Sequence, residues 1–190
     1  MQKTIFALAT GNQTAALSVI RLSGKDCERV LKKLTLKKTP SERLLTLRNF
    51  YFPESNKKLI DRCLVVWMPA PRSYTGEDCV EIYSHGGDAV FQGFFSALAS
   101  FPNVRYAEQG EFSKRAIING KTDLVKAEAV NDLINALTEK QRELAIKQFN
   151  KGLSIPIKQW RKEIIKCMAL IEANIDFSDE SDTPENLDIT

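Results

Sequence analysis

The spacing of apolar residues changes once along this 190-residue chain, near Asp123, and that change limits the possible folds more than any other feature. Before it, short runs such as LIDRCLVVWM (59–68) and CVEIYSH (79–85) are rich in Leu, Val and aromatic residues, which is typical of strands. After it, apolar residues from Ala127 to Phe149 recur mostly every three or four positions, which indicates an amphipathic helix. The sequence therefore predicts a strand-rich first part and a helical second part.

The elements expected along the chain can be given by their ranges. Strands are predicted over 4–10, 17–24, 43–52, 59–68, 79–85 and 104–109, and helices over 25–34, 88–101 and 111–119. In the second part we expect one helix over 123–149, a break at Gly152 and Pro156, and another helix over 160–175. The apolar faces of these helices must be covered, either by a second copy of the chain or by other helices. The acidic stretch 178–190 is predicted to be disordered.

Charge is distributed unevenly, although the whole chain carries a formal net charge of only +3. Lys and Arg outnumber Asp and Glu in residues 1–122, whereas acidic residues outnumber basic ones in 123–190. A basic first part can attract RNA or a smaller anionic ligand, although an ordinary solvated surface has the same composition. Because the charge and the periodicity change at the same place, both indicate a domain boundary near residue 122.

The cysteine and histidine content argues against a zinc site. Cys27, Cys63, Cys79 and Cys167 are far apart and form no C-x-x-C pair, and His85 is the sole histidine. We therefore expect buried, reduced thiols in a cytosolic protein. The longest apolar run, around CLVVWMPAP, is far shorter than the roughly 20 residues that span a bilayer, so no membrane association is predicted.

The string NGKT (119–122) ends like the G-x-x-x-x-G-K-[ST] loop that binds nucleotide phosphates, but the rest of that motif is missing. Arg115 stands where the motif needs its first glycine, and the preceding residues have helical spacing rather than the pattern of a buried strand. Asn119-Gly120 is instead typical of a helix C-terminus, with Gly120 in the left-handed conformation. Lys121 is then either a solvated linker residue or part of a different site.

Strand alternation singles out two charged residues. Arg21 lies on an apolar strand face, and Glu81 shares its strand face with Tyr83 and His85. An arginine on such a face needs an anionic partner or a strand end near water, and a carboxylate can accept a paired set of N–H donors. Arg21 and Glu81 therefore either form a structural ion pair or bind a ligand. His85 is expected to cap or pack at the following turn, and no nucleophile–base pair is indicated.

Longer strings resemble one known family. PAPRSYTGEDCVEIYSHGG (69–87), GEFSKRAIINGKTDLVKAEAVNDLINALTE (110–139) and IEANIDFSDE (171–180) closely resemble the N-terminal part of the tRNA-modification GTPases called MnmE or TrmE. TIFALAT and VIRLSG match the start of the same family, so the resemblance runs in order from residue 4 to residue 180. The sequence departs from the family pattern in the GNQTAA segment, at Gln109 and at Thr122.

The resemblance implies an α+β fold with a mixed-sheet folate-binding and dimerisation domain over 1–121, similar to the tetrahydrofolate domain of aminomethyltransferases. Residues 122–190 would be the first part of a helical domain that, in the family, is interrupted by a GTPase domain. That GTPase insert, which binds GTP with Mg²⁺ and K⁺, is expected to be absent from this chain. With the flavin-dependent partner MnmG, the family modifies carbon 5 of the wobble uridine of tRNA. The resemblance thus implies a cytoplasmic homodimer whose 190 residues alone neither hydrolyse GTP nor modify tRNA.

The family's contacts to 5-formyltetrahydrofolate fall on Arg21, Glu81 and Lys121 of this sequence. The resemblance implies that Glu81 holds the adjacent N–H groups of the pterin, while Arg21 and Lys121 neutralise negative charge or orient the ring. It implies no catalytic and no metal-binding residue here.

Two other functions stay open on the sequence alone. A free-standing folate-dependent one-carbon transferase would need an acid or base near Glu81, for which Asp78 and His85 are available. A tRNA-binding module would use the basic first part, and its affinity would fall steeply with salt because phosphate contacts release counterions.

Overall fold

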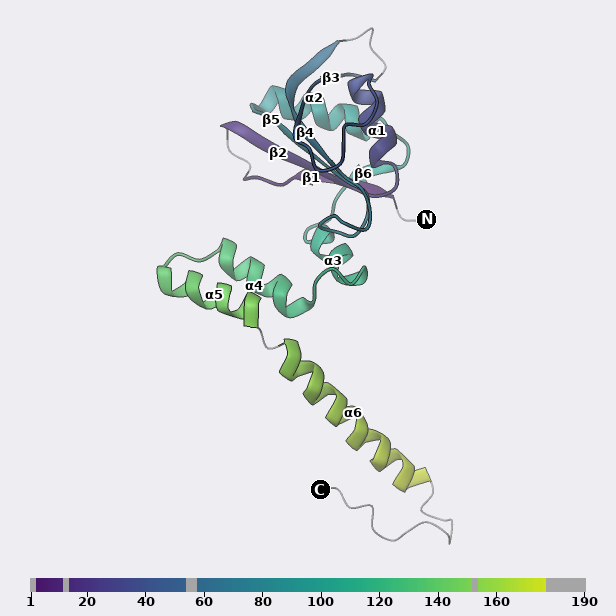
Figure 1. The fold of residues 1–190 in the computed structure, drawn as a ribbon, viewed down its shortest axis with the longest axis vertical. Coiled ribbons are helices and arrows are strands. Elements are labelled where there is room, and N and C mark those ends of the chain that lie inside the picture. The colour runs from purple at the N-terminus through teal and green to yellow at the C-terminus, as the bar shows by residue number, and fades with distance from the viewer. Residues whose placement is uncertain (1–2, 12–13, 54–57, 152–153, 177–190) are drawn as a thin grey trace. The chain divides into compact units, whose positions relative to one another are not determined.

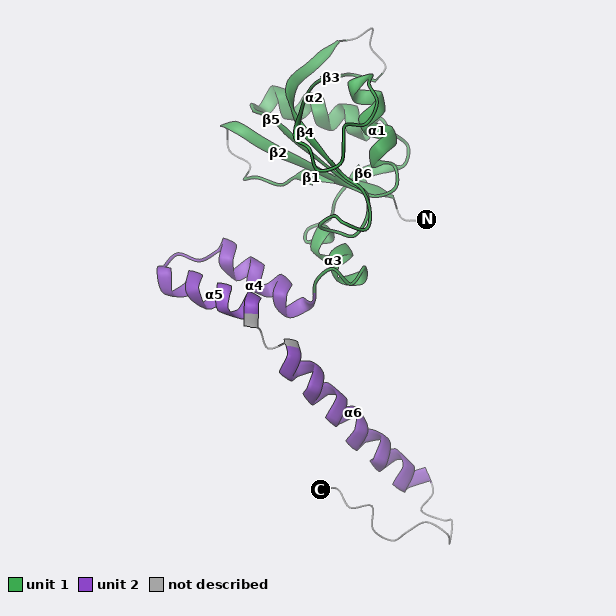
Figure 2. Cartoon of the chain, in the orientation of Figure 1, with its two compact units in different colours: residues 1–122 green, residues 123–190 purple. Residues whose placement is uncertain are grey.

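The computed structural model describes residues 3–11, 14–53, 58–151 and 154–176. Figure 2 shows the chain divided into two compact units, residues 1–122 and residues 123–190. The disorder predicted for 178–190 and the helix break predicted at Gly152 lie outside the described residues.

Residues 1–122 contain all the described strands, with helices between some of them (Figure 1). In chain order the elements are β1 (Thr4–Leu8), β2 (Ala15–Ser23), α1 (Cys27–Thr35), β3 (Thr46–Tyr51), β4 (Leu59–Met68), β5 (Cys79–Gly86), α2 (Asp88–Ala99), β6 (Val104–Tyr106) and α3 (Glu111–Ile118).

The strands of this unit form one sheet in the order β3-β4-β5-β2-β1-β6. β1 pairs with β6 in parallel, whereas the pairs β1–β2, β2–β5, β4–β5 and β3–β4 are antiparallel. The sheet is therefore mixed, which confirms the α+β class that the sequence predicts. Because β5 pairs with β2, the two strands that carry the predicted site residues lie next to each other in the middle of the sheet.

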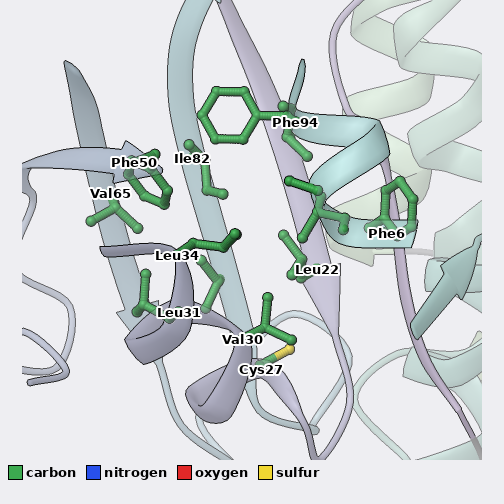
Figure 3. Close-up of a cluster of buried hydrophobic side chains, with 14 of the residues drawn as sticks. Phe6, Leu22, Cys27, Val30, Leu31, Leu34, Phe50, Val65, Ile82 and Phe94 are labelled. Carbon is green, nitrogen blue, oxygen red and sulfur yellow. The ribbon is translucent and has the colours of Figure 1, made fainter. Parts of the chain in front are cut away.

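One face of the sheet is covered by α1 and α2 and forms the hydrophobic core. Strand alternation turns Leu22 and Ile82 toward Leu34 of α1 and Phe94 of α2, as Figure 3 shows. All four side chains are at most 1% exposed, and burying each one contributes about 1.5–3 kcal/mol of hydrophobic stabilisation. The side chains that alternate with the core positions on β2 and β5 project from the opposite face of the sheet.

Several strand boundaries differ from the predicted ones; β1, for example, ends at Leu8 rather than at Thr10. β6 ends at Tyr106, because its register with β1 ends there, so the predicted strand 104–109 is too long. β3 begins at Thr46 rather than at Arg43, whose φ of 59° lies in the left-handed region and is incompatible with a strand. β2 begins at Ala15, two residues before the predicted start at Leu17.

Residues 123–190 contain α4 (Leu124–Ile134), α5 (Glu139–Lys151) and α6 (Ser154–Asp176). The single helix predicted over 123–149 is therefore wrong. The backbone N–H groups of Leu137 and Thr138 both donate to the side-chain oxygen of Gln141, at 2.8 and 3.0 Å, and this cap starts a new helix. The chain reverses at this point, so that α4 and α5 pack against each other and part of the apolar periodicity serves that contact.

Pro156 does not break a helix, in contrast to the prediction. It lies in the first turn of α6, where backbone N–H groups have no acceptor within the helix, so a proline is tolerated. Large apolar side chains of α6, such as Trp160 and Ile164, are each 59% exposed. Among the described residues, none of the helices combines the length and apolar character needed to cross a membrane.

Candidate functional site

Arg21 and Glu81 lie side by side in the middle of the sheet, on the face opposite α1 and α2. They are register partners on the antiparallel strands β2 and β5. Arg21 Nε donates to Glu81 Oε1 at 2.8 Å, and a terminal guanidinium nitrogen lies 2.8 Å from the same oxygen. The two side chains are 27% and 14% exposed, so the pair is partly shielded from water. The structure thus joins the two strand residues that alternation singles out.

Tyr83 occupies the second oxygen of Glu81. Its hydroxyl donates to Glu81 Oε2 at 2.8 Å. Burial and this hydrogen bond raise the pKa of Tyr83 above its ordinary value, so the phenol stays protonated near neutral pH. A carboxylate offers about four lone-pair positions on its two oxygens, so the two nitrogens of Arg21 and the hydroxyl of Tyr83 leave Glu81 about one position for a further N–H donor.

Two aromatic rings flank the guanidinium group of Arg21. Its central carbon lies 5.0 Å from the ring centroid of Tyr74 and 5.8 Å from that of Phe112. An open cavity of about 340 Å³ adjoins Arg21 and Phe112, and residues 7–9 and 107–110 complete its lining. Ala7 and Leu8 of β1, together with Ala9 and Phe112, give the lining an apolar part, and Arg21 is the member of the charged pair that lines it. The cavity therefore suits a flat, partly apolar ligand whose polar edge meets Arg21.

Lys121 lies just after α3, where Gly120 has a φ of 67°. This value confirms the left-handed helix end that the sequence predicts in place of a phosphate loop. Lys121 Nζ donates to the backbone carbonyl of Pro71 at 3.0 Å and makes no hydrogen bond or ion pair with Arg21 or Glu81 in the described part of the chain. The structure therefore brings two of the three predicted site residues into direct contact, and among the described residues the third contacts neither of them.

Two family models match the chain, one after the other. Residues 4–121 match the family described as the N-terminus of the GTP-binding protein TrmE, and residues 124–189 match the MnmE helical domain. The chain belongs to the TrmE family. The matched ranges meet between Lys121 and Leu124, where the two compact units also meet.

Curated relatives in the TrmE family align with nearly all of this chain. A tRNA modification GTPase MnmE of Rhodopseudomonas palustris (strain HaA2) is 47% identical over 185 residues, which are 97% of this chain and 40% of that protein. One from Beijerinckia indica is 44% identical over 182 residues, covering 96% of this chain and 40% of that protein. The Mus musculus protein named 5-taurinomethyluridine-[tRNA] synthase subunit GTPB3, mitochondrial, is 44% identical over 185 residues, which are 97% of this chain and 37% of that protein. The chain thus spans only about two fifths of the length of these relatives.

Two expectations about other side chains need correction. His85 does not cap α2, which has no side-chain cap; its Nδ1 lies 2.9 Å from Asp61 Oδ1 and its backbone N–H donates to Asp61 Oδ2 at 3.0 Å. Cys167 is exposed on α6, whereas the other three cysteines are buried as expected. Within the described ranges, no three potential metal-ligating side chains are grouped together.

Sequence reasoning gave no role to the aromatic side chains around the charged pair. Tyr83 could have been found, because alternation already places it on the same face as Glu81. Tyr74 lies between β4 and β5, in a segment whose irregular backbone has no period from which a side-chain direction follows. The same segment contains Asp78, which accepts from the backbone N–H of Ala70 at 2.9 Å and so supports the loop.

Proposed function

We propose that this chain is the tetrahydrofolate-binding and dimerising portion of a GTPase that modifies carbon 5 of the wobble uridine of tRNA. Relatives named tRNA modification GTPases support the tRNA substrate, and the name of the mouse relative specifies a uridine substituted at position 5. GTP hydrolysis, with Mg²⁺ and K⁺, belongs to a GTPase domain outside residues 1–190, and the flavin-dependent MnmG is the partner enzyme. On this proposal the 190 residues alone neither hydrolyse GTP nor modify tRNA, and the protein acts in the cytoplasm.

The observation that carries the folate proposal is the Arg21–Glu81 pair beside the cavity. The aminopyrimidinone edge of a pterin presents adjacent N–H donors. Glu81 has about one acceptor position left after binding two nitrogens of Arg21 and the hydroxyl of Tyr83, so the second pterin donor would replace one of these contacts. The flat ring would lie in the cavity bounded by residues 7–9 and Phe112. The residues present therefore fit 5-formyltetrahydrofolate, which would supply a one-carbon unit when bound.

Lys121 is proposed to hold the carboxylates of the folate tail. Its ammonium is exposed and has a backbone carbonyl, that of Pro71, as its hydrogen-bond partner. A lysine on a flexible four-carbon stem can exchange this neutral acceptor for a charged one, and a charge-assisted hydrogen bond is the stronger of the two.

A second copy of the chain is the proposed partner of the first unit. Leu47 of β3 and Leu64 of β4 are register partners, and Leu64 is in turn opposite Tyr83 of β5. The two leucines are 47% and 37% exposed on the face opposite the helices. An apolar sheet face beside a ligand site is a surface that a symmetric dimer would bury.

Calorimetric titration with 5-formyltetrahydrofolate tests the site, and light scattering gives the molecular mass of the same sample. Glu81→Ala is expected to weaken binding about 10- to 100-fold, because a hydrogen-bonded charged acceptor is lost. Glu139→Ala, which removes an exposed glutamate of α5, is the matched control and should bind as the wild type does. Unchanged affinity of Glu81→Ala would reject the proposed role, and a monomeric mass would reject the dimer.

A further inference from the structure

Arg115 of α3 is only 1% exposed and is the largest fully buried side chain among the described residues. One terminal nitrogen donates to Glu77 Oε2 at 2.9 Å. The other donates to Glu111 Oε1 at 2.9 Å and to the backbone carbonyl of Lys3 at 2.8 Å. A planar guanidinium can hold several acceptors at once, which a lysine ammonium cannot do with the same geometry.

The two carboxylates bound by Arg115 have further partners. Glu77 Oε2 accepts from the hydroxyl of Ser23 at 2.6 Å. Glu111 accepts from two nitrogens of Arg105, at 2.8 and 2.7 Å. Burial by itself raises the pKa of Glu111, but the hydrogen bonds from Arg105, from a backbone N–H and from Arg115 outweigh it and lower the pKa to about 2. The buried charges of Arg115 and Glu111 are therefore paired, although Arg115 Nε has no hydrogen-bond partner among the described residues, and removing Arg115 would take a charged partner from both carboxylates.

The Arg115 network fastens the loop of residues 69–78 to α3 and its C-terminal turn. Beside the Glu77–Arg115 ion pair, the amide of Asn119 donates to the carbonyl of Thr75 at 2.7 Å. The hydroxyl of Tyr74 lies 3.1 Å from that of Ser113. The loop and the helix are thus joined at several points, and Arg115 provides the buried, charged one.

The joined loop and helix carry the groups that surround the predicted folate site. Tyr74 from the loop and Phe112 from α3 flank the guanidinium of Arg21. Gly76, with a φ of 79°, packs so closely on Lys121 that an added Cβ would lie 3.1 Å from its Cγ. The loop therefore contacts both separated parts of the site, the Arg21–Glu81 pair through one residue and Lys121 through another.

We infer that Arg115 is a positioning residue for the folate site: by tying Glu77 to α3, it holds Tyr74 and Phe112 against Arg21 and keeps Lys121 beside the same loop. The identity of the ligand rests on the proposed function. The effect of Arg115 on the position of the Arg21 side chain does not depend on that function. Arg115 itself is buried and touches no ligand. It acts through the segments that it joins.

The test compares two arginine-to-lysine substitutions in one network. Arg115→Lys replaces the planar guanidinium that joins Glu77 to Glu111 by an ammonium that cannot hold the same acceptors, whereas the matched control Arg105→Lys alters a contact to the same carboxylate, Glu111, and leaves the Arg115–Glu77 pair intact. Affinity for 5-formyltetrahydrofolate is measured by calorimetry. Without ligand, the Nε–H resonance of Arg21 is followed in ¹⁵N-edited spectra, because the rings of Tyr74 and Phe112 shift it.

We expect Arg115→Lys to weaken folate binding about tenfold and to move the Arg21 resonance, while Arg105→Lys stays within about twofold of the wild type with the resonance in place. The inference is wrong if Arg115→Lys keeps the wild-type folate affinity and the wild-type position of the Arg21 resonance. It is also wrong if Arg105→Lys weakens folate binding as much as Arg115→Lys does. A wild-type protein that binds no folate refutes the proposed function alone, since the Arg21 resonance still tests the positioning. If circular dichroism shows Arg115→Lys unfolded, Glu77→Gln, which keeps the side-chain size, decides by the same two readouts.

Discussion

The two units of the chain contain similar apolar side chains but expose them very differently. In residues 1–122, Phe6, Ile20 and Leu34 are all 0% exposed. In residues 123–190, Leu137 is 91% exposed and Ile155 is 77% exposed. Among the described residues of this second unit (Figure 2), alanines alone, at positions 129 and 145, are buried. An apolar stripe with helical spacing therefore predicts a helix, but it does not by itself make a core.

The difference follows from how much surface each architecture can enclose. A sheet offers a broad face, and α1 and α2 cover it with a contiguous cluster of buried side chains. The α4–α5 hairpin and α6 offer narrow stripes that need a further covering surface. Charged residues show the same contrast, because Arg115 is buried with two carboxylates while Arg142 of α5 is 49% exposed beside Glu139.

The largest expected effect comes from one truncation made in both units. Leu34→Ala should lower the free energy of unfolding by about 2–5 kcal/mol, because it leaves a cavity in a closed core. Leu137→Ala should change it by no more than about 0.5 kcal/mol, because that side chain already contacts water. Urea unfolding followed by circular dichroism measures both. Equal losses would show that Leu137 is covered in solution and would remove the contrast.

Acid should destabilise the first unit through Glu111. Its pKa is lowered from 4.5 to about 2 in the folded protein, so the stability it contributes is present above pH 4.5 and is lost as the pH falls through 2. Linkage puts that contribution at roughly 3 kcal/mol. Urea unfolding between pH 5 and 2 should show a steeper loss for the wild type than for Glu111→Gln. Glu128→Gln, on the exposed side of α4, should keep the wild-type slope.

Replacing apolar residues of α6 by polar ones tests whether its apolar face is exposed to water. Ile164 and Ile171 are 59% and 53% exposed, so the double variant Ile164→Glu/Ile171→Glu should bind a hydrophobic dye more weakly and associate less with increasing concentration. The thermal unfolding of the first unit should stay as in the wild type. A fall in that melting temperature would mean that α6 stabilises residues 1–122.

The smallest effect is expected for the exposed ion pair of α5. Arg142→Ala removes a guanidinium that lies 2.5 Å from Glu139, yet both groups are hydrated and screened by salt. The melting temperature should not change measurably, whereas Arg115→Ala should lower it clearly because it removes the charged partner of the half-buried Glu77 and one of the two arginines bound to the buried Glu111. Similar shifts in the two variants would contradict the distinction between the buried and the exposed arginine.

The sequence by itself was sufficient where the controlling geometry is local. Alternation at every second residue placed Arg21 on an apolar strand face and Glu81 on the same strand face as Tyr83 and His85, and the Asn119-Gly120 pair predicted the left-handed end of α3. The change of periodicity near Asp123 likewise separated strands from helices. Each of these depends on the dihedral preferences and side-chain spacing of a few neighbouring residues, which the sequence reports directly.

The tertiary structure alone decided which of those faces meet. Arg21 lies opposite Glu81 because β2 pairs with β5, a strand 60 residues further along the chain at this register, and no local pattern encodes that pairing. The burial of Arg115, the contact of Tyr74 with Arg21 and the reversal between α4 and α5 have the same origin. In each case the outcome minimises the free energy of the whole packed unit, so it depends on residues that are distant in the sequence.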